Sequence, residues 1–512
     1  MPDPNITDLA ALVARIEVLE AELERKDQII AALQKKLFGS KSERIDPDQL
    51  ELLLGEDVLG KPEPLADDAS SGPEENPDRG ARKPRRKKAD LFPKNLMVRV
   101  VETLVPEEVG ADPEAYREIG EEHHDELECV SAALYWNRTV RKKFVRKGER
   151  SSPPCIAPAP EPTLPGTMVG SCLAAQIIAD KHCDHLPHYR QSQRLKRRFG
   201  VDISRSTLNG WVMASARHLS PIGKAIRREL LETTVLQVDE TPIRYLDPGR
   251  GKTAQGYLWV YHDPTRGTVL YDWQLGRGAQ CLEQILQDFT GYLQCDGYRA
   301  YDKFAAKNGK AILAACLAHI RRKFYDAREG APAAAHILKL IQELYRIERE
   351  LRRTGTFPAC RALVRKARAG PLVKELRRTI LNERQCGGHL PRSKMGEALG
   401  YALGQWEQFE RYLEEGALEI DNNLVENAVR PTKLGAKNYL FFGSAEAGKP
   451  NALLYTLIEN AKRQGLDPEK YLEEAIRRLS ENASLEEAAA LTPARIAAEH
   501  AAKVDEAREN AA

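Results

Sequence analysis

Apolar residues recur in alternating steps of three and four along the first part of the chain. They form one narrow seam, which consists of Leu9, Leu12, Ile16, Leu19, Leu23, Ile30, Leu33 and Leu37. Only Lys26 interrupts this seam, and the stretch contains neither Gly nor Pro. The pattern predicts a coiled coil over residues 1–45, and hence a homo-oligomer, because so narrow a seam suits a partner helix. The alternative is an amphipathic helix packed on its own domain.

The next two segments differ in composition and in the pattern of their apolar residues. Residues 46–95 are acidic and rich in Pro, Gly and Ser before they turn basic in RGARKPRRKK, which predicts a linker. Beside a DNA-binding domain, the basic run would contact phosphates without sequence preference. Residues 96–150 alternate between apolar and polar positions and predict a small β-rich module.

A helical DNA-binding region is predicted over residues 167–230. Its second half indicates a helix, a short turn at residues 200–202 and a new helix capped by Ser204 or Ser206, which is the layout of a helix-turn-helix. Any two-helix corner can resemble this layout, but the preceding RLKRRF favours DNA binding. The start of the second helix offers four candidate DNA contacts: Arg205, Ser206, Thr207 and Asn209.

From residue 231 onward, short β segments replace the helical pattern. TTVLQVDET predicts a strand, and GYLWVYHD and TVLYDWQ predict a hairpin. The helix AQCLEQILQDF and two further strands, in GYLQCDGYRAY and KAILAACLAHIRRKF, complete an α/β core over residues 231–320 and 419–445. A helical insertion (321–418) interrupts this core and a helical region (446–512) follows it. The predicted fold class is multidomain α+β.

Two carboxylates fall where predicted strands change from apolar to polar. Asp239 ends one apolar run, and Asp296 ends another beside Gly297. A buried carboxylate is costly unless its charge is offset, although an Asp beside Gly is just as often a turn residue. If the first and fourth strands are neighbours, both carboxylates meet at one sheet edge. A later helix would add Glu426, and three oxygen ligands with open positions suit Mg²⁺.

The helix that carries Glu426 is predicted from EIDNNLVENAVRP. Asp421 or Asn422 would cap its first turn. Glu426 and Arg430 would share a face, as surface ion pairs commonly do. Pro431 would end or kink the helix.

The motifs VDET, CDGYRAY, CLAHIRRKF, DNNLVENAVRP and GAKNYLFFGS resemble, in this order, those of the DDE transposases of the insertion sequence 66 family, the TnpC type. The resemblance extends from the leucine seam to LLYTLIENAKRQGLDPEKYL and covers most of residues 9–475. It implies an RNase H-like core in which Asp239, Asp296 and Glu426 are catalytic and bind Mg²⁺ or Mn²⁺. It also implies double-stranded DNA as a partner, with accessory proteins of the same element as further candidates.

Basic residues near the predicted site are candidate DNA contacts: Arg321, Arg322, Lys323, Arg430 and Lys433. Lys433 lies seven residues beyond Glu426 and would face the same DNA if the helix continued past Pro431. His319 is as readily a structural histidine, so we leave it out of the catalytic residues.

Zinc is not expected, although relatives commonly carry a cysteine-rich zinc-binding segment before the catalytic domain. Residues 96–150 contain Cys129, His123 and His124, which are too few ligands for a closed tetrahedral site. A more distant cysteine such as Cys155 could complete one. We therefore interpret this module as a degenerate zinc-binding segment.

Composition and cysteine usage indicate the cellular compartment in which the protein is expected. The 512 residues carry a net charge of +2, contain no apolar run near the ~18–20 residues of a membrane span, and begin without a secretory pattern. Nine cysteines without a CxxC pair indicate reduced thiols, so we expect a cytoplasmic protein that joins the nucleoid when it binds DNA.

The predicted function is DNA transposition, with cleavage at element ends and strand transfer into target DNA. The alternatives are a catalytically silent DNA-binding regulator, which the full set of three carboxylates disfavours, and an RNase H-like nuclease. The coil and the helix-turn-helix weaken the nuclease hypothesis.

Overall fold

The computed structural model describes residues 134, 143–144, 155–156, 162–247 and 251–509. The predicted coiled coil, the linker and nearly all of the predicted β-rich module lie outside the described residues. Two short strands pair antiparallel: β1 (Lys143–Phe144), inside the range of that module, and β2 (Cys155–Ile156), just after it. Within the described ranges, no helix combines the length and apolar character needed to cross a membrane.

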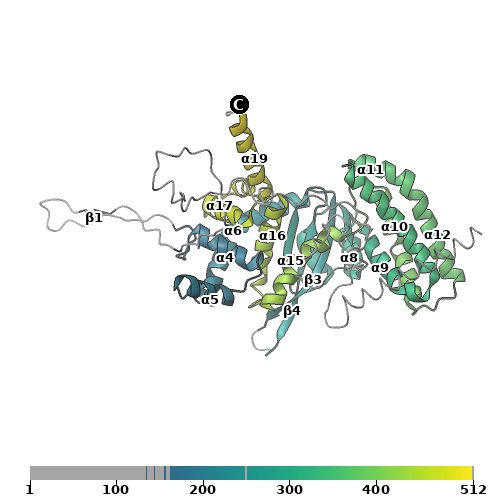
Figure 1. The fold of residues 1–512 in the computed structure, drawn as a ribbon, viewed down its shortest axis with the longest axis horizontal. Helices are drawn as coiled ribbons and strands as arrows, with labels where there is room; N and C mark the ends of the chain where they lie inside the picture. Colours follow the sequence, from purple (N-terminus) through teal and green to yellow (C-terminus); the bar gives the residue numbers. More distant parts are fainter. Residues whose placement is uncertain (1–133, 135–142, 145–154, 157–161, 248–250, 510–512) are drawn as a thin grey trace, which may run out of the picture. The chain divides into compact units, whose positions relative to one another are not determined.

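A five-stranded mixed sheet is the framework of the core (Figure 1). Its strands are β3 (Val235–Leu246), β4 (Thr253–His262), β5 (Val269–Gln274), β6 (Gly291–Cys295) and β7 (Ala311–Ala315). Their order across the sheet is β5-β4-β3-β6-β7. β4 runs antiparallel to β3 and β5, whereas β3, β6 and β7 are parallel. The first and fourth strands of the sheet are thus neighbours, which is the condition under which Asp239 and Asp296 were expected to meet at one sheet edge. The arrangement is consistent with an RNase H-like core.

Helices cover both faces of this sheet: α7 (Ala279–Leu286), α8 (Arg299–Asn308), α15 (Asn423–Tyr439) and α16 (Gly448–Arg463). Side chains alternate between the two faces of a strand, so β3 contributes to two separate apolar clusters. Leu236 packs in the cluster with α7 and α8. Ile243 packs with α15 and α16 on the opposite face.

A second group of helices shares a core with α16: α4 (Ser171–His182), α5 (His188–Phe199), α6 (Arg205–Leu231), α17 (Pro468–Arg478), α18 (Leu485–Ala489) and α19 (Pro493–Glu509). One apolar cluster combines residues of α4, α5 and α6 with residues of the four later helices. The predicted DNA-binding region and the C-terminal helices therefore pack as one unit.

The predicted insertion is helical. Its elements are η3 (Arg328–Gly330), α10 (Pro332–Arg353), α11 (Pro358–Val364), the π-helical turn η4 (Arg365–Ala369), α12 (Gly370–Cys386), α13 (Lys394–Gly404), α14 (Trp406–Glu410) and η5 (Arg411–Leu413). They pack around an apolar cluster that also contains residues of α9 (Leu317–Ala327) and Ile420. The insertion is thus joined to the sheet through α9.

Of the two outcomes predicted at Pro431, an end or a kink of the helix that carries Glu426, the structure excludes the end. α15 continues through the proline to Tyr439. A proline inside a helix removes one backbone hydrogen bond. Val425 and Val429 pack in the apolar cluster on the sheet, and this burial offsets the lost bond.

Candidate active site

Two of the predicted carboxylates lie level with each other on adjacent strands. The parallel pairing of β3 with β6 sets Gln237 opposite Gln294. Two residues further along each strand, Asp239 and Asp296 lie just beyond the last paired residues. The prediction that Asp239 ends its strand is wrong, because β3 continues to Leu246 along β4. The change from apolar to polar residues in β3 instead marks where β3 stops pairing with β6.

The third carboxylate comes from the first turn of α15. Ile243 lies four residues after Asp239, so both face the same side of β3, and Ile243 packs against α15. This face brings Glu426 close enough to Asp239 to raise its pKa. The structure therefore brings together the three carboxylates that the sequence patterns singled out.

The three carboxylates repel one another. Burial raises the pKa of Asp239 well above its usual value, and Glu240, Glu426 and Asp296 raise it further. Burial, with Asp421 and Asp296, raises the pKa of Glu426 to about 7, although Arg322 opposes this shift. A divalent cation bound among these groups would relieve the repulsion and restore their ionised forms.

Buried amides hold the segment before α15 against the sheet. Nε2 of Gln237 donates to Oε1 of Gln294 (2.8 Å) and to the carbonyl of Asp421 (2.9 Å). Gln294 in turn donates to the carbonyl of Glu419 (2.6 Å). The side chain of Asn422 donates to a backbone carbonyl of β3 (3.0 Å). These bonds set where α15 begins relative to the sheet.

Of the two predicted caps, only Asp421 acts on the start of α15. Its Oδ1 accepts from the backbone N–H of Asn423 (3.1 Å). Asn422 occupies the N-cap position, but its side chain makes no capping bond because it is bound to β3.

Glu426 faces α9 rather than its predicted helical partner. Arg430 is exposed and donates to Oδ1 of Asn427 (3.5 Å). Oε1 of Glu426 lies 3.8 Å from Nε2 of His319. Among the described residues, Cys316, His319 and Glu426 are the one set of three potential ligands whose ligand atoms all lie within 4.8 Å of one another. Asp239, Asp296 and Glu426 are not such a set, so sharing one ion requires their carboxylate oxygens to move closer together.

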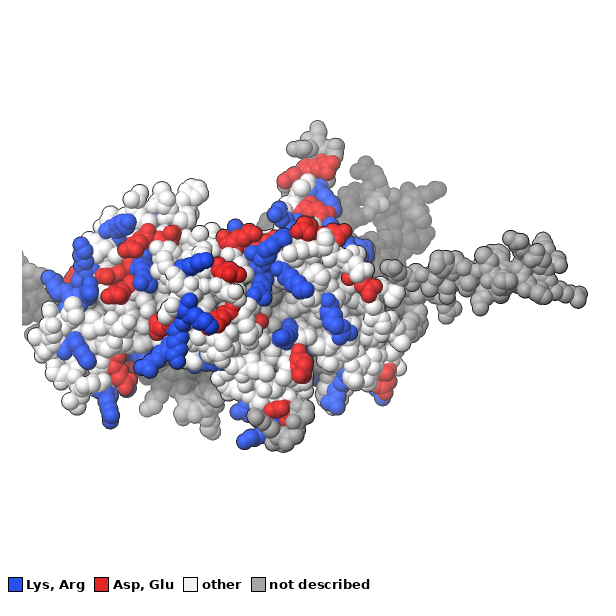
Figure 2. All heavy atoms as spheres, turned by 180° about the vertical axis from the view of Figure 1, so that it is seen from behind, with Lys and Arg blue, Asp and Glu red and all other residues white. Residues whose placement is uncertain are grey.

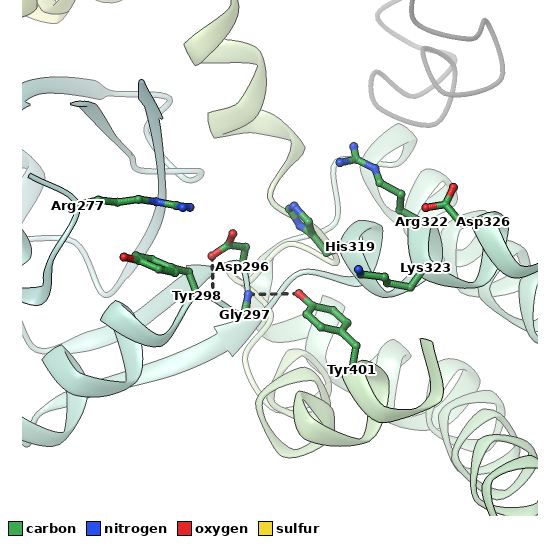
Figure 3. Close-up of a pocket in the computed structure, with 9 residues that line it drawn as sticks. All are labelled: Arg277, Asp296, Gly297, Tyr298, His319, Arg322, Lys323, Asp326 and Tyr401. Atoms are coloured by element: carbon green, nitrogen blue, oxygen red, sulfur yellow. Dashed lines mark hydrogen bonds between the residues drawn. The ribbon is translucent and has the colours of Figure 1, made fainter. Parts of the chain in front are cut away.

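A pocket of about 400 Å³ opens beside Asp296 (Figure 3). It is lined by Arg277, Asp296, Gly297, Tyr298, His319, Arg322, Lys323, Asp326 and Tyr401. Four of these residues belong to α9: His319, Arg322, Lys323 and Asp326. Their spacing of three and four residues places them on one face of the helix, which forms one wall of the pocket. The guanidinium of Arg277 lies over the ring of Tyr298, 4.0 Å from its centroid. Arg322 and Lys323 on α9 and Arg277 before α7 thus place positive charge around Asp296. Such an arrangement suits the binding of a DNA phosphate.

The basic residues predicted near the site have different positions. Arg322 and Lys323 line the pocket. Lys433 donates to a backbone carbonyl of β3 (3.1 Å). Burial lowers the pKa of Lys433, and the nearby Asp239 opposes this shift. Because α15 continues past its proline, Lys433 does face the carboxylates. Arg321 is not among the pocket residues and lies near a tyrosine of α10.

Four pocket residues were not singled out from the sequence: Arg277, Tyr298, Asp326 and Tyr401. Tyr298 lies in the motif CDGYRAY, two residues after Asp296, so its position there was a usable signal. Arg277 precedes α7, and Tyr401 belongs to α13, where its hydroxyl accepts from the backbone N–H of Gly297 (3.2 Å). No local pattern marks these last two residues, because only the fold brings them to the pocket.

Glu240, the neighbour of Asp239, has a different environment. It faces the other side of β3, where its carboxylate is bound by Arg277 and by the hydroxyl of Tyr301. Both partners offset its charge. Glu240 is therefore a structural residue rather than a further metal ligand.

The structure has the predicted helix-turn-helix layout in α5 and α6. Gly200 ends α5 in the left-handed conformation (φ 68°), which favours glycine. Ser204, rather than Ser206, caps α6, because its Oγ accepts from the N–H of Thr207 (3.1 Å). The candidate DNA contacts at the start of α6 are all exposed: Arg205, Ser206, Thr207 and Asn209.

The raised pKa of Glu426 predicts a pH-dependent stability. A carboxyl group whose pKa is higher in the folded than in the unfolded protein destabilises the fold progressively between the two values. In chelator, Glu426→Gln should therefore gain melting temperature relative to the wild type as pH rises from about 4.5 to about 7, and the difference should then level off. Thermal denaturation over this range measures the effect. A constant difference between the two proteins would contradict the assigned shift.

Comparison with known proteins defines the class of this chain as a transposase of the DDE type. The family model described as Transposase IS66 family matches residues 166–450, and one described as Transposase C of IS166 homeodomain matches residues 27–101. The uncharacterised protein y4qI of Sinorhizobium fredii is 33% identical, over 96% of this chain and 93% of its own length. The uncharacterised protein y4jD of the same organism is 32% identical, over 88% of this chain and 90% of its own length. The chain belongs to the IS66 family of transposases.

Proposed function

We propose that this protein cleaves DNA at the ends of its element and joins those ends to target DNA. The observation that carries the proposal is the convergence of Asp239, Asp296 and Glu426 at the end of β6, in a sheet whose order is consistent with an RNase H-like core. Membership of a transposase family supports the choice of DNA as the substrate.

Asp239, Asp296 and Glu426 would hold Mg²⁺ or Mn²⁺. The donor set fits a hard divalent ion, because it consists of carboxylate oxygens with neighbouring positions open to water and phosphate. The mutual repulsion of these groups supports the fit, since a cation offsets it. When bound, such ions supply activation of water and neutralisation of charge on the phosphate.

The other residues of the site bind and orient the DNA backbone. Arg322 and Lys323 on α9, and Arg277 from the opposite wall, would hold a phosphate beside Asp296. Tyr298 keeps Arg277 in place by stacking. Lys433 would contact the same strand from α15, because Asp239 and Lys433 are neighbours.

The reaction consists of two in-line displacements at phosphorus. In the first, a water oxygen bonds to phosphorus at the element end, the bond to the 3′ oxygen breaks, and that oxygen leaves as a 3′-OH. In the second, this 3′-OH attacks a phosphorus of the target strand, whose own 3′ oxygen leaves. Neither step requires a covalent bond between protein and DNA.

Recognition of the element ends is assigned to the exposed start of α6. On the face seen in Figure 2, Lys and Arg side chains lie among Asp and Glu side chains. DNA binding is therefore proposed for local sites, which are the helix-turn-helix and the phosphate pocket. The predicted coiled coil would bring two such subunits to the two ends of one element.

The test uses the full-length protein and a duplex that carries the element's own ends. Mg²⁺ or Mn²⁺ should produce a nick that leaves a 3′-OH at the end, and chelator should prevent it. Tight binding of this duplex without cleavage, in either ion, would overturn the proposal in favour of a silent DNA-binding regulator.

A further inference from the structure

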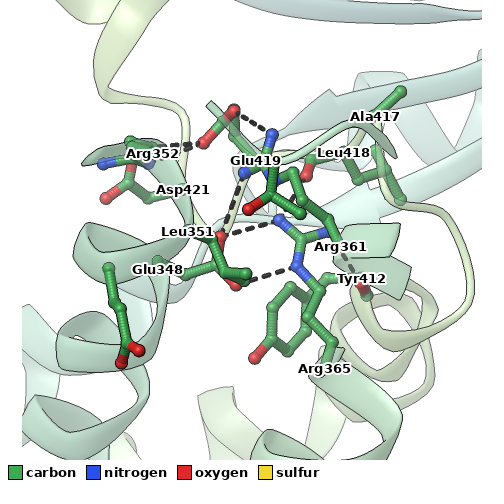
Figure 4. Close-up of polar contacts among 12 residues, drawn as sticks. Glu348, Leu351, Arg352, Arg361, Arg365, Tyr412, Ala417, Leu418, Glu419 and Asp421 are labelled. Atoms are coloured by element: carbon green, nitrogen blue, oxygen red, sulfur yellow. Dashed lines mark hydrogen bonds and ion pairs between the residues drawn. The ribbon is translucent and has the colours of Figure 1, made fainter. Parts of the chain in front are cut away.

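A buried ion network lies where the helical insertion meets the segment before α15 (Figure 4). The fully buried Arg365 binds both oxygens of Glu348, with its Nε and one terminal nitrogen each at 2.8 Å. Arg361 joins two carboxylates, at 3.0 Å from Glu348 and 3.0 Å from Glu419. Arg352 donates to the other oxygen of Glu419 (2.6 Å). Three arginines of the insertion thus converge on two buried carboxylates.

Arg365 also fixes the chain that returns from the insertion to the core. Its terminal nitrogens donate to the carbonyls of Tyr412 (3.1 Å), Glu415 (3.0 Å) and Leu418 (2.8 Å). This arginine begins the π-helical turn η4, and such turns occur frequently at functional sites. The insertion therefore holds both the backbone up to residue 418 and the side chain of residue 419.

The network keeps Glu419 ionised. Burial alone would raise the pKa of Glu419, but Arg352 and Arg361 outweigh it and lower the pKa to about 2. A buried ion pair contributes little net stability compared with apolar residues of the same volume, because desolvation offsets the attraction. Its characteristic effect is to specify one geometry, since a displaced partner leaves an unpaired buried charge.

The chain between Glu419 and Glu426 is fixed at each step. The carbonyl of Ile420 accepts from the backbone N–H that starts α9 (3.1 Å). Asp421 and Asn422 are both bound to β3 by the amides of Gln237 and Asn422 described above. The first turn of α15 follows at once, with the N–H of Glu426 donating to the carbonyl of Asn422 (3.1 Å). A shift at Glu419 would therefore be passed on to Glu426.

We propose that Arg361 and Glu419 are positioning residues through which the helical insertion sets the place of Glu426. They would thereby set the affinity of the metal site that the proposed function requires, and the inference rests on that function. Neither residue would touch the metal or the DNA. The insertion would act on the reaction by holding one ligand in place through Arg361, which lies 58 residues before Glu419 in the chain.

The test measures Mn²⁺ binding to the full-length protein by electron paramagnetic resonance, without DNA. Arg361→Met removes one of the two arginines on Glu419 and leaves Glu348 bound by Arg365. It should weaken Mn²⁺ binding about tenfold, the loss expected when a partner that orients a metal ligand is removed. Glu419→Gln keeps the size of the side chain and should have a similar effect. In both variants, cleavage should recover at high Mg²⁺ while binding of end DNA stays unchanged.

Two variants in the same insertion separate positioning from stability. Ile380→Ala opens a cavity in its apolar core without removing a polar group of the ion network, and should lower the melting temperature without changing Mn²⁺ affinity. Arg368→Met removes an exposed pair with Glu350 and should change neither property.

The inference is overturned if Arg361→Met and Glu419→Gln bind Mn²⁺ as tightly as the wild type. It is also overturned if Ile380→Ala weakens binding equally, because the effect would then follow from stability alone. A wild type that binds no Mn²⁺, or whose binding survives Asp239→Asn, contradicts the proposed function instead. These results are distinct, so failure of one proposal is not mistaken for failure of the other.

Discussion

Replacing Asp239 with Asn is expected to reduce cleavage at the element ends to the level of the uncatalysed reaction. The amide keeps the size of the side chain but removes the negative charge that a divalent ion requires. The core should fold normally, because burial and the neighbouring carboxylates already disfavour the ionised form of Asp239. In chelator the variant should melt at a higher temperature than the wild type. Glu426→Gln should lose cleavage in the same way.

A matched control comes from the same sheet. Asp272 on β5 is a partly buried strand aspartate, and its carboxylate accepts from Gln274 (2.7 Å). Asp272→Asn should keep both cleavage and end binding. Gel assays of nicking and of binding measure these outcomes for all three variants. Nicking at the wild-type rate by Asp239→Asn or Glu426→Gln, in Mg²⁺, would show that the carboxylates are wrongly assigned.

Placing lysines at Leu19 and Leu23 together is expected to convert an oligomer into a monomer. Both leucines belong to the apolar seam, and charged side chains cannot share the buried positions of a coiled coil. The molar mass from light scattering should fall to that of one chain. Strand transfer should fall with it, because two ends must be held together.

The control for this pair adds the same charges on the outer face of the predicted helix. Ala21 and Gln28 lie two positions before and five positions after Leu23, away from the seam. Lysines at these two positions should leave the oligomer intact. A monomeric wild type, or an unchanged mass for the variant with Leu19→Lys and Leu23→Lys, would rule out the coil as the source of association.

The sheet was predictable because its strands are short apolar or alternating runs bounded by turns. VLQV, GYLWVYH and TVLYDWQ each led to the right strand, and the last two form the predicted hairpin. The pairing of the first strand with the fourth was only a condition of the predicted site. The length of β3 was not predictable, since the polar residues after Asp239 pair with β4 beyond the end of β6. The continuation of α15 past Pro431 was not predictable for a similar reason. The burial of its apolar side chains on the sheet outweighs the backbone hydrogen bond that the proline removes.

The site was predictable only where its residues belong to a recognisable motif. Asp239, Asp296 and Glu426 each stand in such a motif, and the fold brings them together. Arg277 and Tyr401 are far from any motif and reach the pocket through tertiary packing.

The ion network had no signal in the sequence either. The insertion is rich in arginine, and which of its arginines are buried depends on how α10, α11 and the chain after α14 meet. Long-range pairs such as Arg361 with Glu419 leave no local pattern.

The central claim is that Asp239, Asp296 and Glu426 share one divalent-metal site, and anomalous scattering from Mn²⁺ in crystals of the full chain with end DNA tests it most directly. The account predicts a peak between Asp239 and Asp296, about 2 Å from a carboxylate oxygen of each, with Glu426 turned toward it. A peak enclosed instead by Cys316, His319 and Glu426, with none between the two aspartates, would contradict the account.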